Sequence, residues 1–320
     1  MMWLTWRLQR PEAMIAGAVM GLIAIFLLAT GLDMASVFRS TGLSACLAHN
    51  PGPNACQGLD TAFGQRFSAV TSAITWLNFV PLVLGILVSA PFVLELEQGT
   101  YRLAWVQSVT RRRWLTVKVA IIVAAAVLAG VALMTLMTWW NGPLDELRSR
   151  LNRSQFDFEG TAPVAYTVFA AALCLAAGSL FRRTVPAIGI TLAGYLAGRI
   201  GMETFVGYSY VAPVTKHVPF SAAGDPNPPS RGDYFISATS SIPKEVMRAC
   251  FGGTLSPPPP GSAAAKQVQS CFGRHGVFAS VVYQPGSRFW LFQGVESVVF
   301  LVPAIALLAL AIWLVRYRLA

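Results

Sequence analysis

Six long apolar segments alternate with polar segments along the 320 residues of the chain. A helix needs about 20 predominantly apolar residues to cross the hydrocarbon core of a bilayer. The apolar segments run roughly over residues 13–32, 72–94, 116–140, 163–181, 185–206 and 291–315. They predict an all-α integral membrane protein with six transmembrane helices.

The polar segments divide the chain into a membrane domain, a large loop and a final helix. Residues 1–206 hold the first five spans, 207–290 form the loop, and 291–320 hold the sixth span and a basic tail. The loop contains the proline run from Pro257 to Pro260 and no strong apolar segment. It is long enough for a small domain that binds something.

The residues before the first span combine tryptophan with arginine. Trp3 and Trp6 stand beside Arg7 and Arg10, a composition that predicts a short helix lying in the membrane interface. A frayed tail fits these few residues equally well. No A-x-A sequence closes the following apolar run, so we expect the first span to be retained rather than cleaved as a signal peptide.

Basic residues predict the orientation of the spans. One side of the membrane holds 11 lysines and arginines in short segments, and the other holds 12 in much longer loops, while Arg199 lies inside a span. Short basic segments face the cytoplasm. We therefore expect a multi-pass protein of the plasma membrane with both termini and the 95–115 connection in the cytoplasm.

Four of the five cysteines fall in the two loops that this orientation places outside. Cys46 and Cys56 lie in the loop 33–71, and Cys250 and Cys271 lie in the loop 207–290. Disulfides persist on the outer side. Pairing within each loop is the simplest connectivity and predicts two disulfides, Cys46–Cys56 and Cys250–Cys271.

The composition and the motif content exclude several functions. Only 12% of the residues are charged, about half the share of a soluble domain, and the net charge of +10 comes from arginines at the ends of spans. We therefore expect no nucleic-acid partner. No G-x-x-x-x-G-K-[ST] loop, H-E-x-x-H or G-x-S-x-G occurs, and the three histidines lack ligand spacing. We expect a non-catalytic chain without a metal or cofactor of its own.

The connection between the second and third spans is more polar than a bare turn requires. Glu95 and Glu97 end the second span, Gly99 and Thr100 break the helix, and residues 101–109 have the pattern of a short amphipathic helix. Acidic groups at the carboxyl end of a helix oppose its dipole, which favours a partner that supplies positive charge or donors. The alternative is a solvated turn with a topology signal at residues 111–113.

Two pairs of polar residues lie in apolar spans. Arg199 and Glu203 are i, i+4 on the fifth span, so they share a face and can pair. They are candidates for an outer gate or pathway lining, or a pair that snorkels to the headgroups. Gln293 and Glu296 share a face near the start of the sixth span, where they line a cavity or anchor the helix at the interface.

Two G-x-x-x-G patterns allow close helix contacts. Gly17 and Gly21 lie in the first span, and Gly194 and Gly198 in the fifth. Packing within one chain and contact with a second copy both fit.

Two sequence segments resemble a known family. ELEQGTYRLAWVQSVTRRRW (95–114) resembles the cytoplasmic loop in membrane subunits of ABC-2-type ATP-binding-cassette exporters, especially those of actinobacteria. YQPGSRFW (283–290), followed by Gln293 and Glu296, is similar to the start of that family's last span. With the six-span layout, the resemblance covers most of the chain outside the outer loops.

The resemblance implies the ABC-2-type exporter fold and a division of labour between chains. Two permease subunits, expected as a homodimer, would each sit on a separate ATPase subunit that holds ATP and magnesium. The residues implied in coupling to the ATPase are Glu95, Glu97, Gly99, Thr100, Tyr101, Trp105 and Arg111.

We therefore expect a permease that exports an amphipathic substrate such as a drug, a peptide antibiotic or a lipid. The alternative is an ABC-type membrane module for outer-face signalling or cell-envelope processes without cargo transport.

Overall fold

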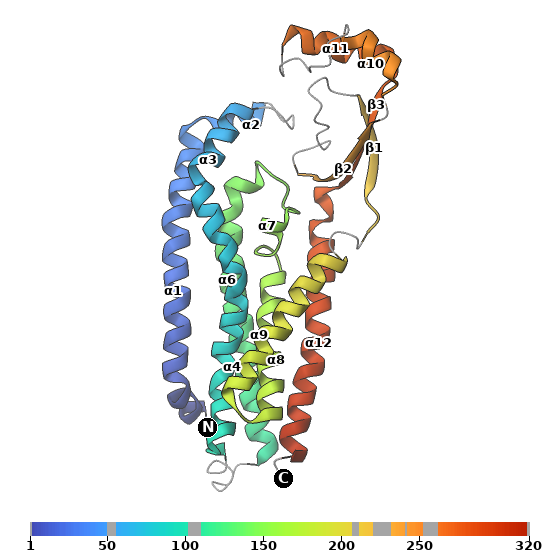
Figure 1. Cartoon of the computed structure of the whole chain (residues 1–320). Coiled ribbons are helices and arrows are strands. Elements are labelled where there is room, and N and C mark those ends of the chain that lie inside the picture. Colours follow the sequence, from blue (N-terminus) through green and yellow to red (C-terminus); the bar gives the residue numbers. More distant parts are fainter. Residues whose placement is uncertain are drawn as a thin grey trace.

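The structure of the chain, a computed structural model, is an elongated helical bundle with a small β-sheet at one end (Figure 1). Both termini lie at the opposite end of the bundle. We call these the sheet end and the terminal end. The residues that the structure describes are 2–49, 56–101, 110–206, 211–219, 232–240, 242–251 and 262–318.

Six helical segments in the described residues are long and apolar enough to cross a membrane, which confirms the predicted number of spans. Their mostly apolar side chains suit a lipid environment. A helix also satisfies its own backbone hydrogen bonds, which a segment surrounded by lipid must do. The elements that form them are α1 (Met2–Ser40), α3 (Gln57–Ile74), η1 (Thr75–Phe79), α4 (Val80–Gln98), α6 (Arg111–Asp145), α8 (Ala162–Phe181), α9 (Thr184–Gly201), η2 (Met202–Val206), η3 (Gly286–Arg288) and α12 (Phe289–Arg318).

The segment 33–71, expected to be a loop, is mostly helical. Helix α1 continues to Ser40, α2 (Leu43–His49) follows, and α3 runs with η1 into α4. Phe63 and Phe67 lie four residues apart, so they share the buried face of α3, and the Phe63 ring packs 5.8 Å from that of Phe38 on α1. This apolar stripe extends both helices beyond the length that a bilayer requires.

The first helix also begins earlier than the sequence indicated. Helix α1 starts at Met2, so the segment expected as a separate interfacial helix continues directly into the first span. Pro11 removes one backbone donor but does not end the helix.

Helix α8 is the centre of the bundle. It is 78% buried over its candidate span and contacts α4, α6, α9 and α12. Alanine fills much of its surface, and neighbouring glycines let other helices approach closely. A Cβ added at Gly85 on α4 would lie 2.5 Å from the Cβ of Ala170 and 2.8 Å from the backbone nitrogen of Ala171.

The two G-x-x-x-G patterns have different environments. Gly194 and Gly198 pack within the chain, because an added Cβ would lie 3.3 Å from Leu173 at the first position and 3.5 Å from Phe169 at the second. Gly17 and Gly21 on α1 have no atom within 4 Å of such a Cβ. Contact with another chain therefore remains open only for the α1 pattern.

The loop 207–290 contains a small sheet and two helices that the sequence did not predict. Strands β1 (Val214–Pro219), β2 (Tyr234–Ser240) and β3 (Phe278–Gln284) form an antiparallel sheet with the order β1-β3-β2. Helices α10 (Lys244–Phe251) and α11 (Ala263–Arg274) lie beyond the sheet (Figure 1). The all-α class therefore describes the membrane region, and the sheet is an addition outside it.

We expect Gly85→Ala to destabilise the fold by about 1–3 kcal/mol, because the new methyl group meets α8 backbone that cannot move aside. Thermal unfolding of the purified protein in detergent measures this effect. Gly189→Ala, inside α9, is the matched control and should leave the midpoint close to that of the wild type, because its methyl group enters open space. Equal midpoints for the two variants would contradict the close α4–α8 contact.

Candidate functional site

The acidic end of α4 is held by two neighbouring helices. The Glu95 carboxylate forms an ion pair with the Lys118 ammonium group on α6. The Glu97 carboxylate accepts hydrogen bonds from the hydroxyl of Thr184 and, at 2.9 Å, from its backbone N–H. Thr184 is the first residue of α9, so Glu97 caps this helix and interacts favourably with its dipole.

These contacts supply the donors that the sequence analysis expected from a partner. Lys118 is buried, with 3% of its surface exposed, and loss of Glu95 would leave an unpaired buried charge. The positions of Glu95 and Glu97 are thus explained within the chain. They also link the end of α4 directly to α6 and α9.

The start of the connection between α4 and α6 is anchored by aromatic packing. Gly99 ends α4 with φ +70°, a conformation that glycine adopts without strain, and Thr100 follows it. The buried ring of Tyr101 lies 6.4 Å from that of Trp114, which stacks on Phe92.

The rest of the connection is only partly described. Arg111 begins α6 and is exposed. The helix expected over 101–109, with Trp105, lies outside the described residues except for Tyr101. The roles of these residues in coupling stay predictions.

A buried charged cluster joins three helices toward the sheet end. Arg199 in the last turn of α9 donates to Asp157, at 2.5 Å and 3.2 Å to the two carboxylate oxygens, and lies 3.4 Å from Glu296 on α12. Its guanidinium carbon is 4.2 Å from the ring centroid of Tyr166 on α8. The Tyr166 hydroxyl donates to Glu296 and, at 3.2 Å, to Asp157. We call these four residues the Arg199 cluster.

The expected partner of Arg199 is a peripheral member of this site. Glu203 approaches Arg199 at 3.5 Å, but its side chain is 52% exposed. The Asp157 carboxylate is closer and only 10% exposed, so it dominates the pairing. Snorkelling does not describe Arg199, since its side chain is 7% exposed and its partners lie inside the bundle.

Asp157 and Tyr166 were missed by the sequence analysis. Asp157 lies between α7 (Arg153–Phe156) and α8, in a segment whose sequence gives no sign that it folds back against α9. Tyr166 could have been noticed, because a phenol in an alanine-rich span needs a hydrogen-bond partner when it is buried.

Gln293 stabilises a helix end. Its side-chain oxygen accepts a hydrogen bond from the backbone N–H of Ala162 at 3.0 Å, and its amide donates to the carbonyl of Phe156 at 2.8 Å. The side chain thus caps α8 from α12. One turn further along α12, Ser297 contacts Thr161 at 2.7 Å. Gln293 and Glu296 share a face, as the sequence indicated. Gln293 bonds to the start of α8, whereas Glu296 contacts Arg199.

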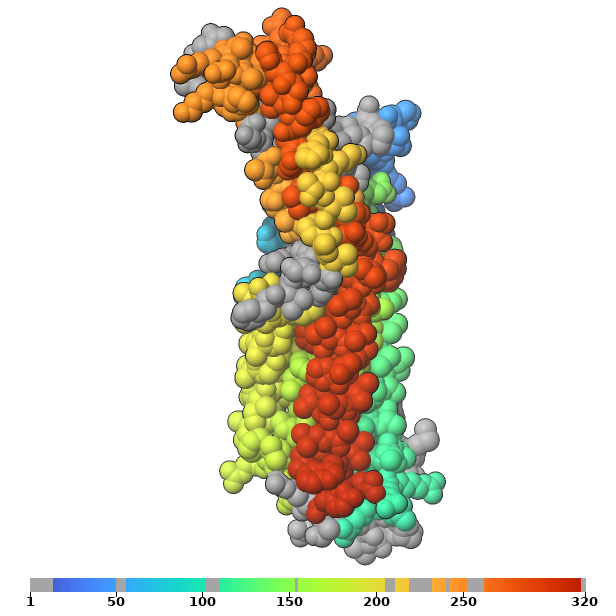
Figure 2. Space-filling view, turned by 90° about the vertical axis from the view of Figure 1, so that its right-hand side faces the viewer, coloured from blue at the N-terminus to red at the C-terminus, as the bar shows by residue number. Residues whose placement is uncertain are grey.

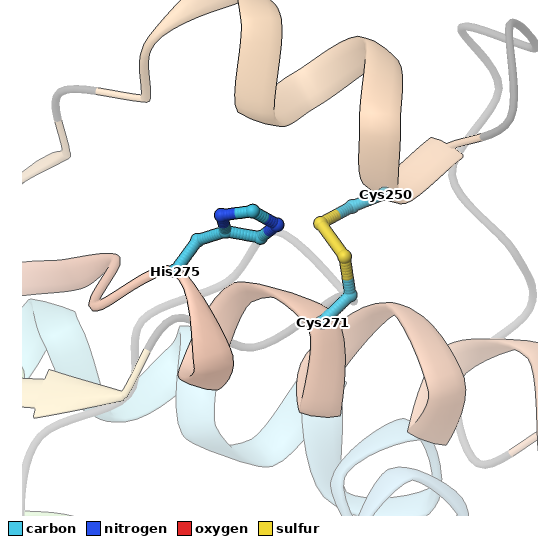
Figure 3. Close-up of side chains that lie close together, drawn as sticks. All are labelled: Cys250, Cys271 and His275. Atoms are coloured by element: carbon cyan, nitrogen blue, oxygen red, sulfur yellow. A yellow bond between two sulfur atoms is a disulfide. The ribbon is translucent and has the colours of Figure 1, made fainter.

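Both expected disulfides are formed, Cys46–Cys56 and Cys250–Cys271. The second lies beside His275, and the three ligand-type atoms are within 4.8 Å of one another (Figure 3). A thiolate is the metal ligand that cysteine offers, and the disulfide removes both thiolates. This group is therefore a covalent link between α10 and α11.

We expect Arg199→Ala to destabilise the protein by about 3–5 kcal/mol, because it leaves buried carboxylates without their cation. The double variant Arg199→Ala/Asp157→Ala should be more stable than the single variant, since it removes one stranded charge. Arg66→Ala is the control: its ion pair with Asp33 spans 3.6 Å and both side chains are more than half exposed, so the cost is about 0–1 kcal/mol. If the loss of stability in the double variant equalled the sum of the losses for Arg199→Ala and Asp157→Ala measured singly by thermal unfolding, the cluster would be contradicted.

Comparison with known proteins gives one family. Residues 17–207 match the model of the family described as ABC-2 membrane transporter related. The match runs from residue 17, inside α1, to just beyond η2 and includes the acidic end of α4 and Arg199. No curated protein and no solved structure matches the chain. The chain is therefore a multi-pass membrane protein that belongs to the ABC-2 membrane transporter related family.

Proposed function

We propose that this chain is the permease subunit of an ABC exporter and that a separate ATPase subunit drives it. Two permease subunits, as a homodimer, would form the translocation pathway and bind two copies of the ATPase. ATP and magnesium would be held by the ATPase. The terminal end of the bundle would face the cytoplasm, which agrees with the short basic segments that lie there.

The observation that carries this proposal is that α9 has a polar attachment near each end. Glu97 binds its first residue, Thr184, and the Arg199 cluster holds its last turn. Fifteen residues separate the two attachments, which is about 22 Å at 1.5 Å per residue. A shift of the end of α4 therefore moves a rigid helix whose other end is part of the cluster.

This arrangement supports a mechanical route for ATP-driven opening. Closure of the ATPase pair would press on the connection between α4 and α6. Because Glu95 and Glu97 tie the end of α4 to α6 and α9, these helices would move together. Displacement of α9 would separate Arg199 from Asp157 and Glu296, so that α8, α9 and α12 could part at the sheet end.

The cluster suits the role of an outer gate in this scheme. Its charges are buried and paired in the closed state, so separating them in an apolar surrounding is costly. Water entering an opening pathway would solvate the separated charges and lower that cost. The gate would therefore stay closed until the ATPase supplies work.

The exposed apolar surface of helix α1 favours contact with a second permease subunit. Only 11% of its apolar span is buried within the chain, and Gly17 and Gly21 leave space for another backbone. The substrate class, an amphipathic drug, peptide antibiotic or lipid, rests on the resemblance to exporters alone.

A second candidate function is sensing or signalling at the outer face. Strand β3 ends at Gln284 and leads through η3 directly into α12, which carries Glu296 two turns later. Arg288 fixes this junction with hydrogen bonds to the carbonyl of Ala212 and to Gln284, both within 2.8 Å. A molecule bound to the sheet subdomain could therefore bias the Arg199 cluster without cargo transport.

Purification of the tagged protein from its own membranes in mild detergent tests the permease proposal. We expect a stoichiometric ATPase with a phosphate loop, identified by mass spectrometry, and vanadate-sensitive ATP hydrolysis by the complex. A folded preparation without such a subunit would contradict the proposal. Co-purification of an outer-face protein as well would favour the signalling function.

We expect Glu97→Ala to lower substrate-stimulated ATP hydrolysis and transport by about tenfold or more while the ATPase still binds, because α9 loses its polar attachment to α4. A loss of about 1.4 kcal/mol in coupling corresponds to a tenfold effect. Glu97→Gln should retain more activity, since its amide oxygen can still accept from the N–H of Thr184. Glu146→Gln, at an exposed position after α6, is the control and should behave as the wild type.

A further inference from the structure

The sheet end of the bundle contains more acidic than basic groups in sheltered positions. Asp157 and Glu296 contact Arg199, and a second group of Asp145, Glu159 and Arg150 lies on the neighbouring segments. Each group thus has two carboxyl groups and one guanidinium group. In the second group no hydroxyl donates a hydrogen bond to either carboxylate, within the residues that the structure describes.

The geometry of the second group leaves two oxygen atoms unused. Arg150 Nε lies 2.8 Å from Oε2 of Glu159 and 3.3 Å from Oδ2 of Asp145, so it contacts one oxygen of each carboxyl group. The other two oxygens, Glu159 Oε1 and Asp145 Oδ1, are buried and are among the four buried side-chain atoms of the described residues without a hydrogen-bond partner. Because the same Nε atom reaches both, the two carboxyl groups lie next to each other.

Burial keeps water from solvating the two carboxyl groups fully. Glu159 has no exposed side-chain surface, and the side chain of Asp145 is 19% exposed. Arg150 is the only charged side chain that pairs with either carboxyl group in the described part of the chain. Its guanidinium is also stacked 4.0 Å from the ring centroid of Phe289 on α12, which fixes it in place. Two adjacent carboxylates with a single positive charge repel each other strongly in such a site.

We propose that Asp145 and Glu159 form a binding site for one proton, held between Oδ1 of Asp145 and Oε1 of Glu159. The proton converts one carboxylate into a donor, so that both orphan oxygens take part in one hydrogen bond. It also makes the group of Asp145, Glu159 and Arg150 electrically neutral. The site joins the end of α6 to the segment before α8, and this segment also carries Asp157 of the Arg199 cluster.

The donor set favours a proton over a metal ion. Calcium takes six to eight oxygen ligands, and magnesium demands near-ideal octahedral geometry, whereas this pair offers two free oxygens beside a guanidinium. No third acidic, histidine or cysteine side chain of the described residues joins the pair at ligand distance. A proton needs only the two oxygens that are present.

A hollow lies beside the site. A hollow of about 370 Å³ is lined by Arg150, Gly160, Trp139 and Trp290, among others. Gly160 follows Glu159 in the chain, so the cavity adjoins the carboxyl pair. Helix α12, which carries Trp290, runs along the face of the molecule in Figure 2. Release of the proton through this cavity would leave a net negative charge and loosen the contact between α6 and the segment before α8.

Two measurements on the whole protein in lipid nanodiscs test the site. In infrared spectroscopy, the wild type should show the carbonyl stretch of a protonated carboxylic acid near neutral pH, and both Asp145→Asn and Glu159→Gln should lose it. In thermal unfolding, raising the pH from about 6 to about 9, a range where an unperturbed carboxyl group is fully ionised, should lower the midpoint of the wild type. The midpoint of the wild type should fall by about 3 °C or more beyond the fall seen in Glu159→Gln over the same pH range.

Glu146→Gln is the matched control, because Glu146 follows Asp145 directly and is exposed. It should retain both the infrared band and the pH dependence of the wild type. The proposal is overturned if the wild type has no such band, or if neither variant at the pair removes it. It is also overturned if sodium or calcium ions raise the midpoint of the wild type but not of Glu159→Gln, since a metal ion then occupies the site.

Discussion

A buried guanidinium requires carboxylate partners, and this requirement organises the sheet end of the bundle. Arg199 is 6% exposed, and its partners come from three other parts of the chain. Water cannot replace these partners without opening the bundle. The cluster therefore fixes the relative positions of α8, α9 and α12, and it breaks only when those helices separate.

The terminal end follows a different rule. There the polar contacts are made by the end of one helix, α4, on two others, through Glu95 to Lys118 and Glu97 to Thr184. Between the two ends, α4 and α9 lie against α8, where small residues allow close packing. Close-packed helices move as rigid bodies rather than bend. Displacements are thus expected to pass from one set of charges to the other along the helices.

The sequence predicted those features that depend on a long apolar run or on local spacing. Six spans follow from hydropathy, and both disulfides follow from two cysteines in each outer loop. It also pointed to Arg199, because a charge in a span is costly. It did not find Asp157, since no local pattern shows that a polar loop folds back against α9. The helical extension around Phe63 was missed because its apolar stripe is interrupted by polar residues typical of a loop.

The partners of the strands and of the second carboxyl pair could not be predicted from local sequence patterns either. Strands β1 and β2 pair with β3, which lies more than 35 residues further along the chain, so their partners are set by tertiary contacts. Asp145 and Glu159 are likewise ordinary loop-flanking acids until α6 and the segment before α8 meet. Spacing and composition identify which residues are unusual, whereas the fold decides which of them meet.

Hydrogen–deuterium exchange of the complex with its ATPase tests the central claim most directly, namely that α9 links the two ends. Vanadate trapping should raise exchange in residues 155–161 and 195–204 of the wild type, because the Arg199 cluster opens. In Glu97→Ala, the ATPase should still bind and trap vanadate, but this rise should be absent. An equal rise in wild type and variant would contradict the link through α9.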